Sequence, residues 1–282
     1  MRRLIVLGSA KGAPGVTTTA LALAASWPSG VDGGVRPVMV EADAQGGALA
    51  VRFGRSYTPG LLDVAAAARR PQPGSLLGAV QELPFGVRVV VAPVGPVACA
   101  EAVRMLGKGT AALVGCGSDG ARGTVLVDVG DFGEDTEDLV AEAERLVLVT
   151  RGGADELAHV FARCELLGAA ASKALLVVVG PCSYSEQDIV AAVGVGEVCF
   201  LPWDVRTAEV LAGRAQAQNP LRTHGRLAPR LLRAAGGASR RLLGEGQVDS
   251  PPAGLERDLA SSRAAVLPSL TRGALDVGEG GR

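Results

Sequence analysis

A glycine-rich segment near the amino terminus has the residue types of an anion-binding loop. It runs from Gly8 to Thr19 with the sequence GSAKGAPGVTTT, directly after the apolar run Leu4–Leu7. Glycines allow the backbone to approach a phosphate, and successive N–H groups together with a helix amino terminus cradle its charge. Between a strand and a helix that opens on threonines, such a loop predicts a phosphorylated ligand. The alternative interpretation is an ordinary glycine turn.

Carboxylates that follow two other apolar runs have the spacing to serve the same ligand. Glu41 and Asp43 stand at i and i+2 where a strand is expected to end, so both are predicted to face the phosphate edge. Asp128 follows the run Thr124–Val127, and an apolar strand that ends in an acid is the usual source of a Mg²⁺-shell carboxylate. Acids and glycines also close strands simply as turn residues.

The loop lacks the lysine of the general phosphate-binding pattern GxxxxGK[ST]. Ala10 stands at the first glycine position and Val16 at the lysine position. A charge-assisted contact of this kind commonly contributes about 1.5–3 kcal/mol, so its loss weakens affinity by tens to hundreds of fold. A second alternative is therefore a degenerate site that binds nothing.

With these departures, the loop resembles the deviant Walker A loop, KGGxGK[ST], of the ParA/MinD family of P-loop ATPases. The resemblance places Lys11 on the catalytic signature lysine, which in the family reaches across a dimer interface to the partner's nucleotide. It places Thr17 on the Mg²⁺ ligand and Thr18 on the residue that contacts the α-phosphate. The other nucleotide-binding positions are Gly12, Ala13, Pro14, Gly15 and Val16. The resemblance implies ATP and Mg²⁺ as ligands and a homodimer.

Two later segments extend the resemblance. Residues 40–47, VEADAQGG, are similar to the switch I sequence DxDPQG, with Ala44 in place of proline. This similarity implies that Asp43 positions the attacking water. Asp128 matches the Walker B carboxylate, a second Mg²⁺ ligand, and residues 128–131 are a loose version of switch II.

A third segment, Leu201–Asp204, resembles the loop that flanks the adenine base, which makes Pro202 a nucleotide-binding residue. Gly180 and Pro181 stand where relatives have a base-reading asparagine, so the sequence does not predict purine selectivity. Trp203 has two interpretations of equal weight, which are stacking on a base and covering the edge of the sheet.

Apolar, β-branched runs alternate with Ala/Leu-rich helical patterns over most of the chain. The runs are residues 4–7, 37–41, 87–92, 124–127, 146–150, 175–179 and 198–201. This alternation predicts an α/β fold, a mostly parallel, doubly wound sheet of about seven strands with helices on both faces. The resemblance makes it a P-loop NTPase fold of the SIMIBI type. The pattern stops near Gly244, so we expect one domain over residues 1–243 and a disordered tail over 244–282.

The composition predicts a cytoplasmic protein. The 28 Lys and Arg balance 29 Asp and Glu, so net charge indicates no particular partner. The five cysteines lack metal-ligand spacing and are expected as core residues in a reducing compartment. No signal peptide is recognisable, and no apolar run reaches the roughly 18 residues of a membrane helix.

One local segment, Leu221–Leu243, is basic and contains no acid. Its arginines are Arg222, Arg226, Arg230, Arg233, Arg240 and Arg241. They suit non-specific contacts to DNA phosphates or, at most peripherally, an anionic membrane. The favoured interpretation is a solvated basic helix whose Leu227, Leu231 and Leu232 pack on the domain. Pro229 and Gly236-Gly237 argue against a long membrane-anchoring helix like that of MinD.

The preferred function is a dimerising, Mg²⁺-dependent ATPase that positions DNA, septum, or pilus and secretion machinery. The alternative is a non-hydrolysing scaffold or localisation adaptor of the same fold, similar to TadZ. A nitrogenase iron-protein type is disfavoured because residues 128–135 contain no cysteine for a bridging cluster. A ligase of the dethiobiotin-synthetase type would carry a lysine-bearing loop that the sequence lacks.

Overall fold

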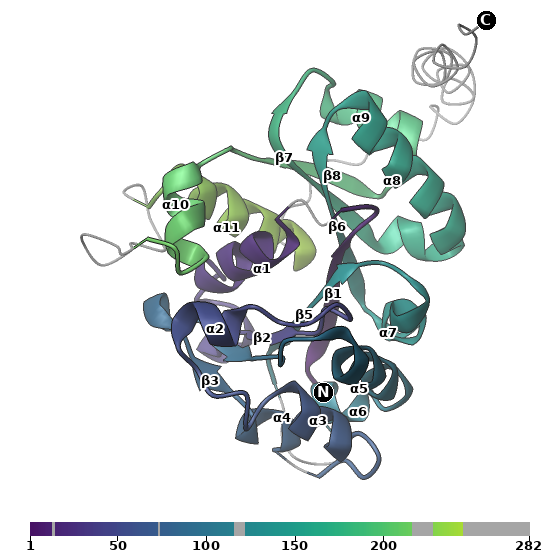
Figure 1. Ribbon diagram of the computed structural model, residues 1–282. Helices are drawn as coiled ribbons and strands as arrows, with labels where there is room; N and C mark the ends of the chain where they lie inside the picture. The colour runs from purple at the N-terminus through teal and green to yellow at the C-terminus, as the bar shows by residue number, and fades with distance from the viewer. Residues whose placement is uncertain (13–14, 73, 116–121, 216–227, 245–282) are drawn as a thin grey trace, which may run out of the picture.

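The computed structural model describes residues 1–12, 15–72, 74–115, 122–215 and 228–244 (Figure 1). Ala13 and Pro14 of the glycine loop lie outside the described residues, as do Arg222, Arg226 and Leu227. The proposed tail lies outside them as well, apart from Gly244. The domain boundary near residue 243 therefore stays a prediction.

The described chain forms an eight-stranded sheet in the order β3-β4-β2-β5-β1-β6-β7-β8. All neighbouring strands are parallel except β3, which is antiparallel to β4. The strands are β1 Arg3–Ser9, β2 Val38–Glu41, β3 Gln81–Glu82, β4 Arg88–Val90, β5 Thr124–Asp131, β6 Arg145–Gly152, β7 Ala174–Cys182 and β8 Glu197–Leu201. Seven of them coincide with the seven apolar runs, which confirms the predicted α/β sheet. The additional strand β3 is only two residues long, too short to show a period-2 pattern.

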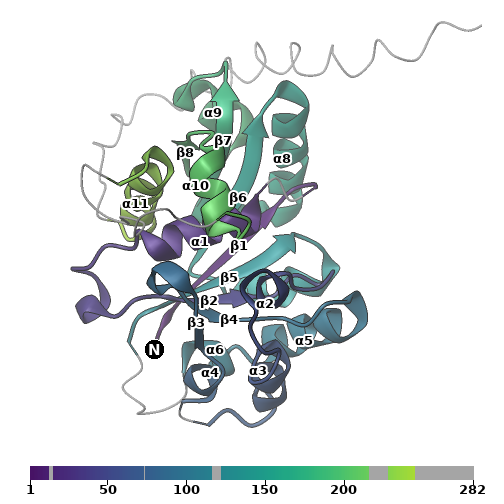
Figure 2. The same ribbon diagram turned by 60° about the vertical axis from the view of Figure 1, so that its left-hand side comes forward.

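Helices cover both faces of the sheet (Figures 1 and 2). One face carries α1 Val16–Ala25, α2 Leu49–Phe53, α10 Val205–Leu211 and α11 Arg230–Leu242. The other carries α3 Leu61–Ala67, α4 Ser75–Gly78, α5 Pro96–Lys108, α6 Ala111–Val114, α7 Glu137–Glu142, α8 Ala154–Leu167 and α9 Glu186–Val193. Short 3₁₀ turns span Asp32–Gly34, Pro84–Gly86, Glu134–Thr136 and Gly168–Lys173.

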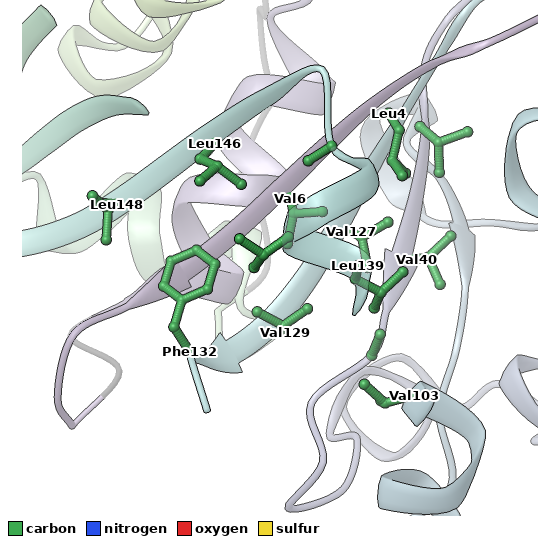
Figure 3. Packing of buried hydrophobic residues seen from close by; sticks show 14 of the residues in the cluster. Leu4, Val6, Val40, Val103, Val127, Val129, Phe132, Leu139, Leu146 and Leu148 are labelled. Carbon is green, nitrogen blue, oxygen red and sulfur yellow. The ribbon is translucent and has the colours of Figure 1, made fainter. Parts of the chain in front are cut away.

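Side chains of the central strands alternate between two apolar clusters. In β1, Leu4 and Val6 enter the cluster under α3 to α9, whereas Ile5 and Leu7 enter the cluster under α1 and α11. Figure 3 shows the first cluster, in which Phe132 lies close to Val129 of β5. Both faces of these strands are buried, so they read in the sequence as continuous apolar runs.

Parallel pairing brings the functional segments to one edge of the sheet. Ser9 of β1 is paired with Asp131 of β5 on one side and with Val149 of β6 on the other. Glu41 of β2 is level with Asp128 of β5. Ligands of open α/β sheets bind at the carboxyl ends of the strands, and this edge therefore contains the glycine loop and both predicted acidic segments.

The basic segment ends in α11, which packs against α1. Leu231 and Leu232 are buried in the same cluster as α1, so the favoured interpretation of a packed helix is confirmed for these two residues. Arg233 donates to the Ala228 carbonyl at 3.0 Å, and Arg241 donates to Glu186 at 2.9 Å. The other two arginines of α11, Arg230 and Arg240, form no side-chain hydrogen bond or salt bridge with the described residues.

We expect Leu232→Ala to lower the free energy of unfolding by about 2–4 kcal/mol, because it removes a fully buried side chain and leaves a cavity beneath α11. Urea unfolding monitored by circular dichroism measures this change. Arg240→Ala, on the exposed side of the same helix, is the control and should change stability by less than about 0.5 kcal/mol. A loss below 1 kcal/mol for Leu232→Ala would show that α11 is not an integral part of the domain.

Two composition-based expectations have structural counterparts. Cys99, Cys164 and Cys199 are buried and Cys182 is half-buried, all as free thiols, while Cys116 lies outside the described residues. Burial raises the pKa of the Cys199 thiol to about 12 and that of Cys164 to about 11, so both are unreactive packing groups. None of the described helices combines the length and apolar character required to cross a bilayer.

Candidate functional site

The glycine loop leads directly into α1, and two of its glycines have left-handed backbone conformations. Gly12 has φ +71°, and Gly15, the N-cap of α1, has φ +89°. A Cβ atom at either position would meet no described atom within 4 Å. The backbone angles, and not crowding, therefore favour glycine here, and the space beside the loop is open for a ligand.

A cavity of about 500 Å³ opens at the amino terminus of α1. Among the predicted nucleotide-binding residues, its lining includes Gly12, Gly15, Val16, Thr17, Thr18 and Pro202. The far side is formed by the loop after β8 and by α10, including Trp203, Val205 and Ala208. The structure therefore brings together two segments that are almost 190 residues apart in the sequence. Lys11, Asp43 and Asp128 are not part of this lining.

Val16 occupies the lysine position with an apolar side chain that is 1% exposed. It packs in the cluster of α1 and α11 and also lines the cavity. The helix dipole and the N–H groups of α1 remain available to an anion, but this position supplies no positive charge.

Asp128 lies on β5 with 1% of its surface exposed. Its Oδ1 accepts the N–H of Gly130 at 3.1 Å, whereas its buried Oδ2 has no hydrogen-bond partner in the described part of the chain. Burial raises the pKa of Asp128 to about 7, a shift that the nearby Thr17 hydroxyl opposes and that Glu41 and Asp43 reinforce. A buried carboxylate oxygen without a partner is costly unless a cation or proton joins it.

Thr17 and Asp128 therefore fit a Mg²⁺ ion that also takes oxygens from phosphates and water. The described residues contain no group of three or more His, Cys, Asp or Glu side chains placed to hold a metal by themselves.

Asp43 lies half-buried beside the end of β5. Its Oδ1 accepts the N–H of Gln45 at 2.8 Å, and the other oxygen lies against Gly130, where a Cβ atom would collide with it. Gly130 also has φ +69°, so glycine is required there on two grounds. Burial raises the pKa of Asp43, and the nearby charge of Asp131 adds to the shift. Asp131 itself accepts a hydrogen bond from the hydroxyl of Ser9.

The expectation that Glu41 faces the ligand together with Asp43 is wrong. The Glu41 carboxylate is 3% exposed and accepts backbone N–H groups of Ala48 at 2.7 Å, Leu49 at 3.0 Å and Ala92 at 3.0 Å. Burial raises its pKa, and these three hydrogen bonds oppose the shift. Glu41 therefore holds the start of α2 and the end of β4 together, a role that local strand alternation could not indicate.

Lys11 is exposed, and its Nζ lies 3.2 Å from Nε2 of His159 on α8. The ammonium group donates this hydrogen bond, since a lysine ammonium has no acceptor. The sequence assigned no chemistry to His159, and only the fold brings α8 next to the loop. A role for Lys11 in catalysis stays a prediction.

The side of the cavity opposite the glycine loop contains an aromatic ring that is 58% exposed, Trp203. The guanidinium of Arg151 lies over this ring, 5.4 Å from its centroid. This distance is typical of a cation–π contact. Trp203 therefore lines the cavity and contacts Arg151. Neither of the two interpretations of Trp203 from the sequence, base stacking or covering the sheet edge, included this contact.

Sequence reasoning missed three arginines of the cavity lining, which are Arg52, Arg151 and Arg214. They come from α2, from the end of β6 and from the segment after α10. No local motif marks Arg52 or Arg214, so the sequence contained no signal for them. Arg151 directly follows an apolar strand run at the expected ligand edge, which is the one signal that could have found it.

The parallel sheet and the glycine loop at the start of α1 define an α/β nucleotide-binding fold of the P-loop class. Similar solved structures include a ParA family ATPase from Chlorobium tepidum, with a TM-score of 0.62 and 15% identity over 84% of this chain and 97% of that one. The cell division ATPase MinD from Pyrococcus furiosus has a TM-score of 0.63 and 19% identity, and the match covers 87% of this chain and 100% of the MinD chain. MinD of Pyrococcus horikoshii, solved with Mg-ADP, has a TM-score of 0.63 and 18% identity, and the match covers 86% of this chain and 96% of the MinD chain.

The chain therefore has the fold of the ParA and MinD ATPases, as the glycine loop predicted. No protein-family model matches the sequence, and no curated protein matches it.

Proposed function

We propose that this protein binds ATP and Mg²⁺ at the amino terminus of α1 and hydrolyses ATP as a homodimer. The observation that carries the proposal is the buried Oδ2 of Asp128, which has no hydrogen-bond partner among the described residues and lies beside Thr17, a residue that lines a ligand-sized cavity. A cation would satisfy this oxygen, and phosphates at the helix terminus would complete the coordination of the cation.

Each residue of the site has a defined task in this proposal. The backbone around Gly12 and Gly15 and the hydroxyl of Thr18 bind the phosphates. Thr17 and Asp128 hold the Mg²⁺ ion, which neutralises charge on the phosphate oxygens when it is bound. Pro202 and Trp203 flank the base at the opposite end of the cavity.

Asp43 orients the attacking water in this mechanism. Its carboxylate is fixed by the N–H of Gln45 and by contact with Gly130, so it lies beside the end of β5 in a defined position. Burial raises its pKa, which makes the carboxylate a better proton acceptor. Lys11 approaches the phosphates of the partner subunit's nucleotide across the dimer interface, as in the family that the loop resembles. Positioning and charge stabilisation supply most of the catalysis in such sites.

The proposed cellular role is the positioning of a cargo, such as DNA, the septum, or pilus and secretion machinery, in the cytoplasm. Similar structures include a MinC:MinD cell division complex from Aquifex aeolicus and a plasmid partition protein from Borrelia burgdorferi bound to AMPPNP. Non-specific DNA binding through the basic segment has limited support, because Arg233 and Arg241 already have intramolecular partners. Retardation of random duplex DNA at low salt that depends on ATP would support it.

Titration with MgATP, followed by sizing, tests the proposed function. We expect saturable binding and an ATP-dependent shift from monomer to dimer, with phosphate release that Asp43→Ala abolishes. Gln45→Ala is the control, because it leaves the backbone N–H that fixes Asp43. No binding at millimolar MgATP would overturn the proposal. Binding and dimerisation with phosphate release equal to that of Asp43→Ala would instead identify the non-hydrolysing scaffold, the alternative that Val16 motivates.

A further inference from the structure

Three arginines line the nucleotide cavity, from which the loop lysine is missing. Arg52, Arg151 and Arg214 all line it, and none of them forms a salt bridge within the described residues. The lining contains two carboxylates. Asp204 already caps α10 by accepting from the N–H of Thr207 at 3.1 Å and from its hydroxyl at 2.7 Å. Three guanidinium groups therefore face two lining carboxylates, of which Asp204 has its oxygens engaged by Thr207, and Arg52 also interacts electrostatically with the buried Glu41.

The position of Arg151 follows from strand register. Val149 of β6 is level with Ser9 of β1, so Arg151 lies two residues beyond the point where β1 enters the glycine loop. Side chains two apart in a strand share a face, and Val149 belongs to the cluster beneath α1. Arg151 therefore projects on the face of α1, level with Val179, which also lines the cavity. The ring of Trp203 holds its guanidinium there.

The other two arginines are placed by neighbouring elements. Arg52 is on α2, whose first N–H groups are fixed by Glu41. Arg214 follows α10 in a turn in which its N–H donates to the Glu209 carbonyl at 2.8 Å. The backbone at Gly213 packs against Phe53 and the Arg52 carbonyl, so the segments that carry Arg52 and Arg214 are in direct contact.

We propose that Arg52, Arg151 and Arg214 form the polyphosphate-binding cation cluster of this cavity and replace the lysine that is absent at Val16. The inference rests on the proposed nucleotide function and names residues outside its sequence motifs. Guanidinium groups are suited to phosphate oxygens because they offer several donors in a fixed plane. A ligand with several negative charges balances the excess of arginine over carboxylate, whereas adenosine alone does not.

Calorimetric titration of the full chain with MgATP, inorganic tripolyphosphate and adenosine tests the proposal. We expect Arg151→Ala to weaken tripolyphosphate and ATP binding by about tenfold or more, and the triple alanine variant by more than about a hundredfold. Arg151→Lys should lose less than Arg151→Ala because it keeps the charge. Arg206→Ala, an exposed arginine of α10 outside the lining, is the matched control and should bind as the wild type does.

A second-site substitution tests the replacement directly. If the arginines replace the loop lysine, Val16→Lys should restore most of the affinity that Arg151→Ala loses, and Val16→Met, which adds length without charge, should not. Thermal unfolding of each variant shows whether it is folded, since Val16 is buried. Failure of Val16→Lys to rescue in a folded double variant would count against the replacement.

The three probes separate failure of this inference from failure of the proposed function. ATP binding that the triple variant retains within twofold would overturn the cation cluster and leave the ATP site intact. Arginine-dependent binding of tripolyphosphate without binding of ATP would support the cluster and overturn the nucleotide function. Binding of neither probe to the wild type would overturn both.

Discussion

Asp128→Asn should abolish Mg²⁺-dependent ATP binding and at the same time make the protein more stable at pH 8. Burial raises the Asp128 pKa from 3.8 to about 7, so the folded chain takes up a proton that the unfolded chain releases. The contribution of Asp128 to the free energy of unfolding is therefore highest below about pH 4 and falls as the pH rises towards 7. Three pKa units correspond to about 4 kcal/mol, and we expect asparagine to recover roughly 2–4 kcal/mol at pH 8.

Urea unfolding at pH 4.5 and pH 8, without Mg²⁺, measures this difference. The wild type should lose more stability than Asp128→Asn between these values, and Glu41 and Asp43, whose pKa values burial also raises, should leave a residual slope in the variant. Saturating MgATP should raise the stability of the wild type by about 2.7 kcal/mol at one hundred times the Kd and leave the variant unchanged. Equal stabilisation of both proteins by MgATP would remove Asp128 from the Mg²⁺ site.

Lys11→Ala should reduce phosphate release on the order of a thousandfold, the lower end of what a charge delivered across an interface contributes in P-loop enzymes. Val16→Lys should change it much less, because the apolar Val16 side chain makes no polar contact that the substitution would remove. Lys11 is exposed in the described monomer and bonded only to His159. Its loss should therefore leave the stability of the monomer within about 0.5 kcal/mol of the wild type.

The contact with His159 provides the control for this prediction. His159→Ala removes the partner of Lys11 without removing its charge, so phosphate release should stay at or above the wild-type rate. Single-turnover phosphate release above the dimerisation concentration measures all three variants. An unchanged rate in Lys11→Ala, or equal losses in Lys11→Ala and His159→Ala, would contradict a role for Lys11 in trans.

The sequence predicted the parts of the site that depend on local backbone geometry. The loop before Val16 needs glycines with positive φ, and Gly12 and Gly15 adopt such angles. The strand that delivers Asp128 is marked by its apolar run, because both of its faces are buried. These features are contained within a dozen residues, where spacing alone determines which side chains lie together.

The sequence did not predict the parts that depend on contacts between distant segments. Strand alternation placed Glu41 beside Asp43, but the N–H groups of Ala48 and Ala92 bind its carboxylate in the fold. The contact between Lys11 and His159 joins elements almost 150 residues apart. No periodic pattern in the sequence indicates that residues so far apart in the chain lie in contact.

By itself, the sequence determined the class of fold and the placement of the glycine loop, Thr17 and Asp128 at one edge of the sheet, because each follows from a local pattern. The tertiary structure decided which charges surround the candidate site. It buried Val16, left Oδ2 of Asp128 without a hydrogen-bond partner among the described residues and raised the pKa of Asp128. It also collected three arginines from separate elements around one cavity. Burial and proximity set these electrostatic properties, and both arise only when the sheet and its helices are assembled.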